Sequence, residues 1–226
     1  YALKVAAQIA KKNDGEIFLL HMLELPTTGN DAVSRAHDIP ELMFFKNAAV
    51  AKLDELMDAD YLDGVKISRI IQFEMAFEGI IKNGEAHNAD LIVMGSHGAN
   101  GFQEMFIGSN TEKVVRNSNV PVLVIEREED TFNASKFVFA SDFSDEIKKP
   151  FEKVVEFVNK FGSHLYLANI NTPNNFKSTK VAQKQMDEFI ANFKIDNYST
   201  HIYNDVNVEK GILHFAKSID ADIIGM

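Results

Sequence analysis

Residues 90–125 constrain the fold most, because they join a buried strand, a glycine-rich loop, a helix start and a second strand in one run. The apolar residues 91–94 are typical of a strand that is buried on both faces of a parallel sheet. The last glycine of the loop, Gly108, directly precedes the sequence SNTE, a capping-box pattern that predicts a helix with Ser109 as its N-cap. This order of elements predicts an α/β fold.

The glycine loop is also a candidate phosphate site. Gly108 and Ser109 stand at the expected helix start, where backbone N–H groups lack partners within the helix and the helix dipole is positive. The alternative is a tight turn whose glycines only permit positive φ and close packing. The separate Gly108-Ser109 pair favours the phosphate site, since a purely structural turn does not need it. Capping by Ser109 is compatible with a phosphate contact.

The rest of the chain alternates between helical and strand patterns. In the first half we expect helices at 1–13, 41–61 and 76–88 and from Ser109 onward, strands at 17–22, 64–73, 91–94 and 121–125, and a surface loop at 27–40. In the second half we expect strands at 136–142, 164–170, 198–206 and 222–226, and helices at 143–161, 181–193 and 208–219. Such alternation predicts a parallel sheet with crossover helices.

The two halves can be aligned as copies of each other. Met22 matches Ile170, Gly79 matches Gly211 and Asp90 matches Asp222, with a shorter loop after the second strand of copy two. We therefore expect a tandem repeat of one domain, with domain 1 at residues 1–128 and domain 2 at 134–226. In this alignment copy one lacks its first strand and copy two ends before its own glycine loop, so both domains are incomplete.

Composition excludes several classes of function. The formal charge of −10 disfavours nonspecific binding to nucleic acid or to anionic membranes. The chain contains no cysteine, which excludes disulfides, cysteine-based zinc sites and thiol nucleophiles. No apolar run has transmembrane length, and no signal peptide is expected at Tyr1. A cytoplasmic location fits these features.

The sequence offers no constellation for fast catalysis, and we assign no catalytic residue. The Walker-type lysine is missing before Ser109, and no Ser/His/Asp triad or arginine finger is evident. No histidine stands at metal-ligand spacing to another histidine or to a carboxylate cluster, so we expect no protein-only metal site. A binding module or a slow ATP hydrolase fits better than a dedicated ATPase.

The glycine spacing and its flanks resemble a known family. Two residues separate Gly95 from Gly98, nine separate Gly98 from Gly108, and Ser109 follows. DLIVMGSHG precedes the loop, NVPVLVI follows it, and ASDFS at 140–144 is typical of the exit from the first strand. Over essentially its whole length the chain resembles the universal stress proteins in their tandem two-domain form.

The resemblance implies a fold and a ligand. The fold is an open, doubly wound parallel sheet of five strands in the order 3-2-1-4-5, with ATP at the carboxyl ends of the strands and Mg²⁺ or Mn²⁺ arriving with the triphosphate. The residues implied for nucleotide binding are Gly95, His97, Gly98, Gly108, Ser109, Asn110 and Met22 in copy one, and Asp142 and Ile170 in copy two. The alternative for Asp142 is a cap of the helix that follows it.

The resemblance also implies a biological role and partners. The role is nucleotide-linked signalling or stress adaptation. The fifth strand at 121–125 pairs the two domains, and the chain can pair further into a homodimer. The alternatives are a structural or interaction module of the same fold with an empty pocket, and an enzyme, either a slow ATPase or a relative of the nucleotide-alpha-phosphate hydrolases.

Overall fold

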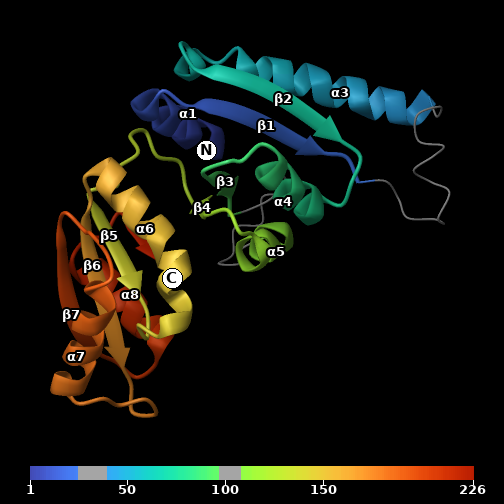
Figure 1. Ribbon diagram of the computed structural model, residues 1–226. Helices are drawn as coiled ribbons and strands as arrows, with labels where there is room; N and C mark the ends of the chain where they lie inside the picture. Colours follow the sequence, from blue (N-terminus) through green and yellow to red (C-terminus); the bar gives the residue numbers. More distant parts are fainter. Residues whose placement is uncertain (25–39, 97–107) are drawn as a thin grey trace. The chain divides into compact units, whose positions relative to one another are not determined.

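Every strand pair in the structure is parallel, as the alternation of helices and strands predicts. The structure is a computed structural model that describes residues 1–24, 40–96 and 108–226 (Figure 1). Contacts divide the chain into two units, unit 1 at Tyr1–Phe132 and unit 2 at Asn133–Met226. The loop expected at 27–40 lies outside the described residues except for its last position.

Unit 2 has one four-stranded sheet with the order β7-β6-β5-β8. Numbered within the unit, this is the order 3-2-1-4 of the expected doubly wound fold. Its elements are β5 (Lys136–Ala140), a 3₁₀ turn η2 (Asp145–Ile147), α6 (Lys148–Phe161), β6 (His164–Asn171), α7 (Thr179–Ile190), β7 (Tyr198–Asn204), α8 (Val208–Ser218) and β8 (Ile223–Gly225).

The core of unit 2 lies on both faces of this sheet. On one face Phe137 and Phe139 of β5 belong to a buried cluster that α6 and α7 complete. On the other face Val138 and Ala140 belong to a second cluster that α8 completes. Alternate residues of a strand point to opposite faces, so the apolar run of β5 is explained by burial on both sides.

The helix predicted from residue 143 begins later, and that prediction is wrong at its start. The N–H of Ser144 donates to Asp142 Oδ1 at 3.0 Å, and Phe143 has a positive φ of 55°. This local turn stops the chain from entering a helix directly, and α6 begins only at Lys148.

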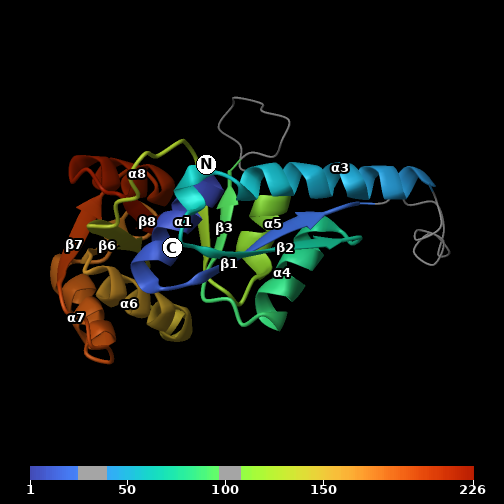
Figure 2. The same cartoon turned by 90° about the horizontal axis from the view of Figure 1, so that it is seen from above.

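The described residues of unit 1 form two strand pairs, β1-β2 and β3-β4. Its elements are α1 (Ala2–Asn13), β1 (Glu16–Met22), α3 (Pro40–Met57), η1 (Asp60–Leu62), β2 (Lys66–Gln72), α4 (Ala76–Ala86), β3 (Ile92–Gly95), α5 (Ser109–Asn117) and β4 (Val122–Ile125). Helix α3, which lies beside β2 in both views (Figures 1 and 2), ends before the residue 61 predicted for it.

The described residues of unit 1 include no strand equivalent to the central strand β5 of unit 2. In unit 2, β5 pairs with β6 on one side and with β8 on the other. In unit 1 no described strand joins β1 to β3, the strands that follow the same sequence patterns as β6 and β8. Most of β6 is buried, whereas no residue of β1 is fully buried. In unit 2 the central strand β5 thus lies between β6 and β8.

One glycine in each unit packs a helix against a strand end, and the two glycines are positions that the alignment of the copies matches. A Cβ atom added to Gly79 of α4 would overlap the terminal methyl of Met22, and one added to Gly211 of α8 would overlap Cγ2 of Ile170. A side chain at either position would therefore require the neighbouring residue to move. Met22 and Ile170 therefore hold equivalent places in the two units.

We expect Gly211→Ala to lower the free energy of unfolding by about 1–2 kcal/mol, because Ile170 is branched and stiff and cannot move aside. The matched variant Gly79→Ala should change it by less than about 1 kcal/mol, since the end of Met22 is flexible and alanine favours the helix. Urea denaturation followed by circular dichroism measures both. Equal losses in the two variants would contradict this account of the contacts.

Candidate functional site

The ends of the glycine loop in unit 1 are joined by hydrogen bonds. Gly95 is the last residue of β3, and the next residue, Ser96, is only 3% exposed. The N–H of Ser96 donates to the carbonyl of Ile125 at 3.0 Å, and its carbonyl accepts from the N–H of Gly108 at 2.7 Å. The hydroxyl of Thr111 donates to the carbonyl of Gly95 at 3.0 Å. These bonds place the start of α5 beside the end of β3.

The predicted N-cap role of Ser109 is wrong. The N-cap of α5 is Gly108, which has no side chain to cap with, and Ser109 is the first helical residue. The cause is the bond from Gly108 to Ser96, which fixes Gly108 at the cap position. The expected capping box does not form either, because Glu112 pairs with Arg116, with 3.0 Å between Oε1 and Nε.

The structure brings together some of the residues predicted for phosphate binding. Gly95, Gly108, Ser109 and Asn110 lie around the start of α5, with Ser109 exposed and Gly108 and Asn110 half-buried. His97 and Gly98 lie outside the described residues. Met22 ends β1, on the other strand pair of the unit, where it packs against Gly79.

The first N–H groups of a helix have no acceptor within it. The start of α5 can therefore offer backbone donors and the positive end of a helix dipole to an anion. This arrangement can hold phosphate in a chain of net negative charge, because it uses no cationic side chain.

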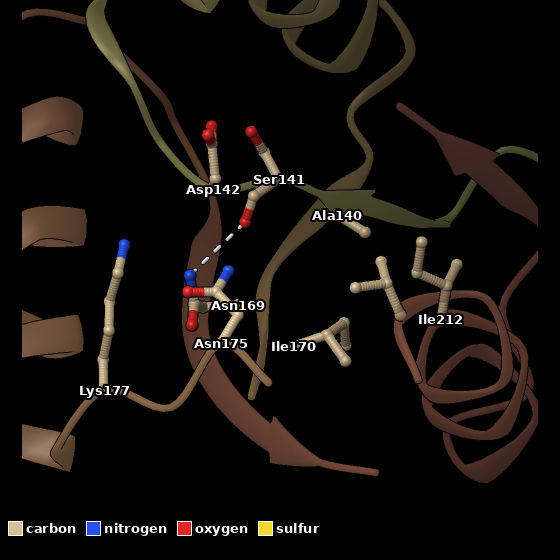
Figure 3. A pocket seen from close by; sticks show the side chains of 9 residues that line it. Ala140, Ser141, Asp142, Asn169, Ile170, Asn175, Lys177 and Ile212 are labelled. Carbon is tan, nitrogen blue, oxygen red and sulfur yellow. Dashed lines mark hydrogen bonds between the residues drawn. The ribbon is translucent and has the colours of Figure 1, made fainter. Parts of the chain in front are cut away.

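Unit 2 has a pocket of about 120 Å³ at the carboxyl ends of β5 and β6 (Figure 3). Its apolar part is formed by Ala140, Ile170, Val208 and Ile212, and its polar part by Ser141, Asp142, Asn169, Asn175 and Lys177. Asp142 and Ile170, both predicted as site residues, thus line one pocket. Its volume suits one ring system rather than a complete nucleotide, because pockets for drug-sized ligands have roughly 300–1,000 Å³.

The surroundings of Asp142 keep its carboxylate charged. The backbone N–H of Ser144 has the largest effect in lowering the pKa of Asp142, and the Ser144 hydroxyl, the charge of Lys177 and the Ser141 side chain lower it further, while partial burial opposes them. Asp142 therefore serves the turn that precedes α6 and also lines the pocket. The capping interpretation and the ligand interpretation are compatible.

Four polar residues of this pocket were missed from the sequence, namely Ser141, Asn169, Asn175 and Lys177. The sequence does hold one signal, because Asn169 and Asn171 interrupt an otherwise apolar strand. Both are buried in β6, at 6% and 4% exposure. Buried amides need partners, so their presence in a buried strand could have indicated a polar site.

The profile that describes the Universal stress protein family matches residues 1–126. The chain belongs to this family.

Individual relatives agree with this membership. Universal stress protein MJ0531 of Methanocaldococcus jannaschii is 32% identical over 127 residues, which are 56% of this chain and 74% of that protein. Universal stress protein YxiE of Bacillus subtilis is 30% identical over 139 residues, which are 55% of this chain and 88% of that protein.

A solved structure resembles the whole chain. The universal stress protein from Archaeoglobus fulgidus DSM 4304 is 25% identical, with a TM-score of 0.69 over 99% of this chain and 78% of that one. A putative universal stress protein from Pseudomonas aeruginosa UCBPP-PA14 has a TM-score of 0.60 over 98% of this chain at 16% identity, which shows the fold alone. The tandem form of the universal stress protein fold thus accounts for both units.

The described residues include no helix that is long and apolar enough to span a membrane. They also include no group of three or more histidine, aspartate or glutamate side chains placed to hold a metal ion.

We expect Thr111→Val to lower the free energy of unfolding by about 1 kcal/mol, because the buried hydroxyl loses its bond to the Gly95 carbonyl. Thr111→Ser keeps the hydroxyl and should recover much of this loss. Thermal or urea denaturation measures the difference. If valine proves as stable as threonine, the hydrogen bond does not hold α5 to β3.

Proposed function

We propose that this universal stress protein binds an adenine nucleotide, ATP, in unit 1. The observation that carries the proposal is the 2.7 Å bond from Gly108 N–H to the Ser96 carbonyl, which sets the start of α5 at the end of β3. Phosphates bind at Gly95, Gly98, Gly108, Ser109 and Asn110, and His97 lies beside them. Met22 presents its backbone to adenine.

The proposed ligand agrees with the donors available. A triphosphate needs several N–H donors and a positive potential, and the start of α5 supplies both. Mg²⁺ or Mn²⁺ arrives with the triphosphate and neutralises part of its charge. The family membership supports a nucleotide rather than another anion, since the glycine spacing is the one found in its nucleotide-binding members.

The proposal extends to unit 2, where Asp142 and Ile170 contact adenine or ribose. They stand at the ends of β5 and β6, and in the fold of this family ligands bind at such strand ends. The apolar side of the pocket suits a flat ring, and the charged carboxylate of Asp142 suits ribose hydroxyls or an amino group.

The proposed activity is nucleotide binding rather than fast hydrolysis. In this proposal the protein is cytoplasmic and transmits a stress signal by pairing with another copy or between its own units. Among the described residues β4 pairs only with β3, so its second edge can accept a strand. Such an edge suits pairing between the two units or between two copies of the chain. A slow hydrolysis of bound ATP is the alternative to pure binding.

ATP titrated into the full chain, followed by calorimetry, should show binding that Gly108→Val weakens at least about tenfold, because the valine side chain obstructs the donors at the start of α5. Gly15→Ala is the control, since a Cβ there meets only ordinary contacts. Circular dichroism checks that both variants fold.

Two results would oppose the proposal. Unchanged ATP affinity in Gly108→Val would show that ATP does not bind at the start of α5. If calorimetry shows no binding and no nucleotide co-purifies with the protein, the alternative of a structural or interaction module with an empty pocket is favoured. ADP release that disappears in Gly108→Val would instead identify the same loop as the site of a slow hydrolase.

A further inference from the structure

A closed turn after β6 builds one wall of the pocket in unit 2. The side-chain amide of Asn171 donates to the carbonyl of Lys177 at 2.9 Å, and the N–H of Lys177 donates back to Asn171 Oδ1 at 3.1 Å. Within the turn, the N–H of Asn175 donates to the carbonyl of Thr172 at 3.1 Å. Because Asn171 is buried, the turn is anchored in the core, and Lys177 has a fixed starting point beside the pocket.

Lys177 forms no ion pair with a described carboxylate, although its charge acts on the nearby Asp142. Its Nζ donates to Oε1 of Gln185 at 2.7 Å, and Nε2 of Gln185 donates to the carbonyl of Asp142 at 2.8 Å. A neutral amide thus positions the ammonium group without neutralising it. Lys177 and Asp142 both line the pocket (Figure 3), and the charge of Lys177 is one of the causes that lower the pKa of Asp142.

Asn169 adds a buried amide with unused bonding capacity. Its Nδ2 makes one long bond to the carbonyl of Ser141, at 3.4 Å, and no described residue donates to its Oδ1. Among the described residues only Ser163 Oγ is a fully enclosed side-chain polar atom without a partner, so Oδ1 of Asn169 keeps some accessible surface. Since Asn169 lines the pocket, a ligand there can donate a hydrogen bond to this oxygen.

We propose that Lys177 is the residue by which the pocket of unit 2 selects a negatively charged ligand, a nucleoside phosphate. The ring fills the small enclosed part of the pocket, on its apolar side, with its polar edge at Asn169. The ribose and phosphate extend from the open side of the pocket, where the phosphate pairs with the ammonium group of Lys177. This role rests on the nucleotide class proposed above, but it concerns a different unit and a side chain instead of a helix start.

The two charges of the pocket also orient the ligand. The carboxylate of Asp142 repels phosphate and accepts hydrogen bonds from hydroxyl or amino groups. The ammonium group of Lys177 attracts phosphate and releases Gln185 when the ion pair forms. A nucleoside phosphate satisfies both groups when its hydroxyls face Asp142 and its phosphate faces Lys177.

The test uses the full chain with Gly108→Val, which removes the proposed site of unit 1, and compares adenosine, adenosine 5′-monophosphate and inorganic phosphate by calorimetry. With Lys177 present, the monophosphate should bind about tenfold more tightly than adenosine, the size of effect expected from a charge-assisted bond. Lys177→Met should bring the two affinities within about twofold of each other, and Lys177→Arg should keep the difference. Asn169→Leu should weaken adenosine and the monophosphate alike.

Several outcomes would overturn the role of Lys177. They are equal affinities for adenosine and the monophosphate, a preference that survives in Lys177→Met, and no binding of either compound. A purely structural role in tethering α7 predicts lower stability of Lys177→Met with an unchanged ratio of affinities. If ATP binding is insensitive to Gly108→Val while this ratio depends on Lys177, the proposal for unit 1 fails and the role of Lys177 stands.

Discussion

Parallel pairing of a central strand with a neighbour on each side is the constraint on which each α/β unit depends. In unit 2, β5 supplies this strand, and its side chains are buried on both faces of the sheet. In unit 1 the described strands form two pairs, and β1 is left half-buried. Parallel strands end at one edge of a sheet, so the same constraint that builds the core also gathers the polar groups at that edge.

The two units use this edge in different ways. In unit 1 the bond between Ser96 and Gly108 places the start of α5, and the anion site proposed there consists of backbone N–H groups. In unit 2 a turn anchored by Asn171 places Lys177, and the anion site proposed there uses a side-chain charge. Copies of one domain can therefore differ in the ligands they prefer while Met22 and Ile170 keep the same packing against a helix glycine.

Hydrophobic periodicity predicted most elements, because it reflects burial on sheet faces and helix faces. The strand order was implied by the resemblance to the family, and unit 2 shows its first four positions. Prediction from the sequence failed where a contact distant in the chain decides local structure. Ser109 is not the N-cap because Ser96 holds Gly108, and Lys177 was missed because only the folded turn brings it beside Asp142. Neither contact leaves a periodic signal. The placements of His97 and Gly98 stay predictions, since these residues lie outside the described part.

The central claim is that phosphate is held at the start of α5. The most direct measurement is the change in backbone amide chemical shifts of isotope-labelled full chain when ATP is added. The account predicts that the largest shifts in unit 1 fall on Gly108, Ser109 and Asn110, with smaller changes along the rest of α5. Shifts that leave these three amides unchanged, while ATP binds, would contradict it.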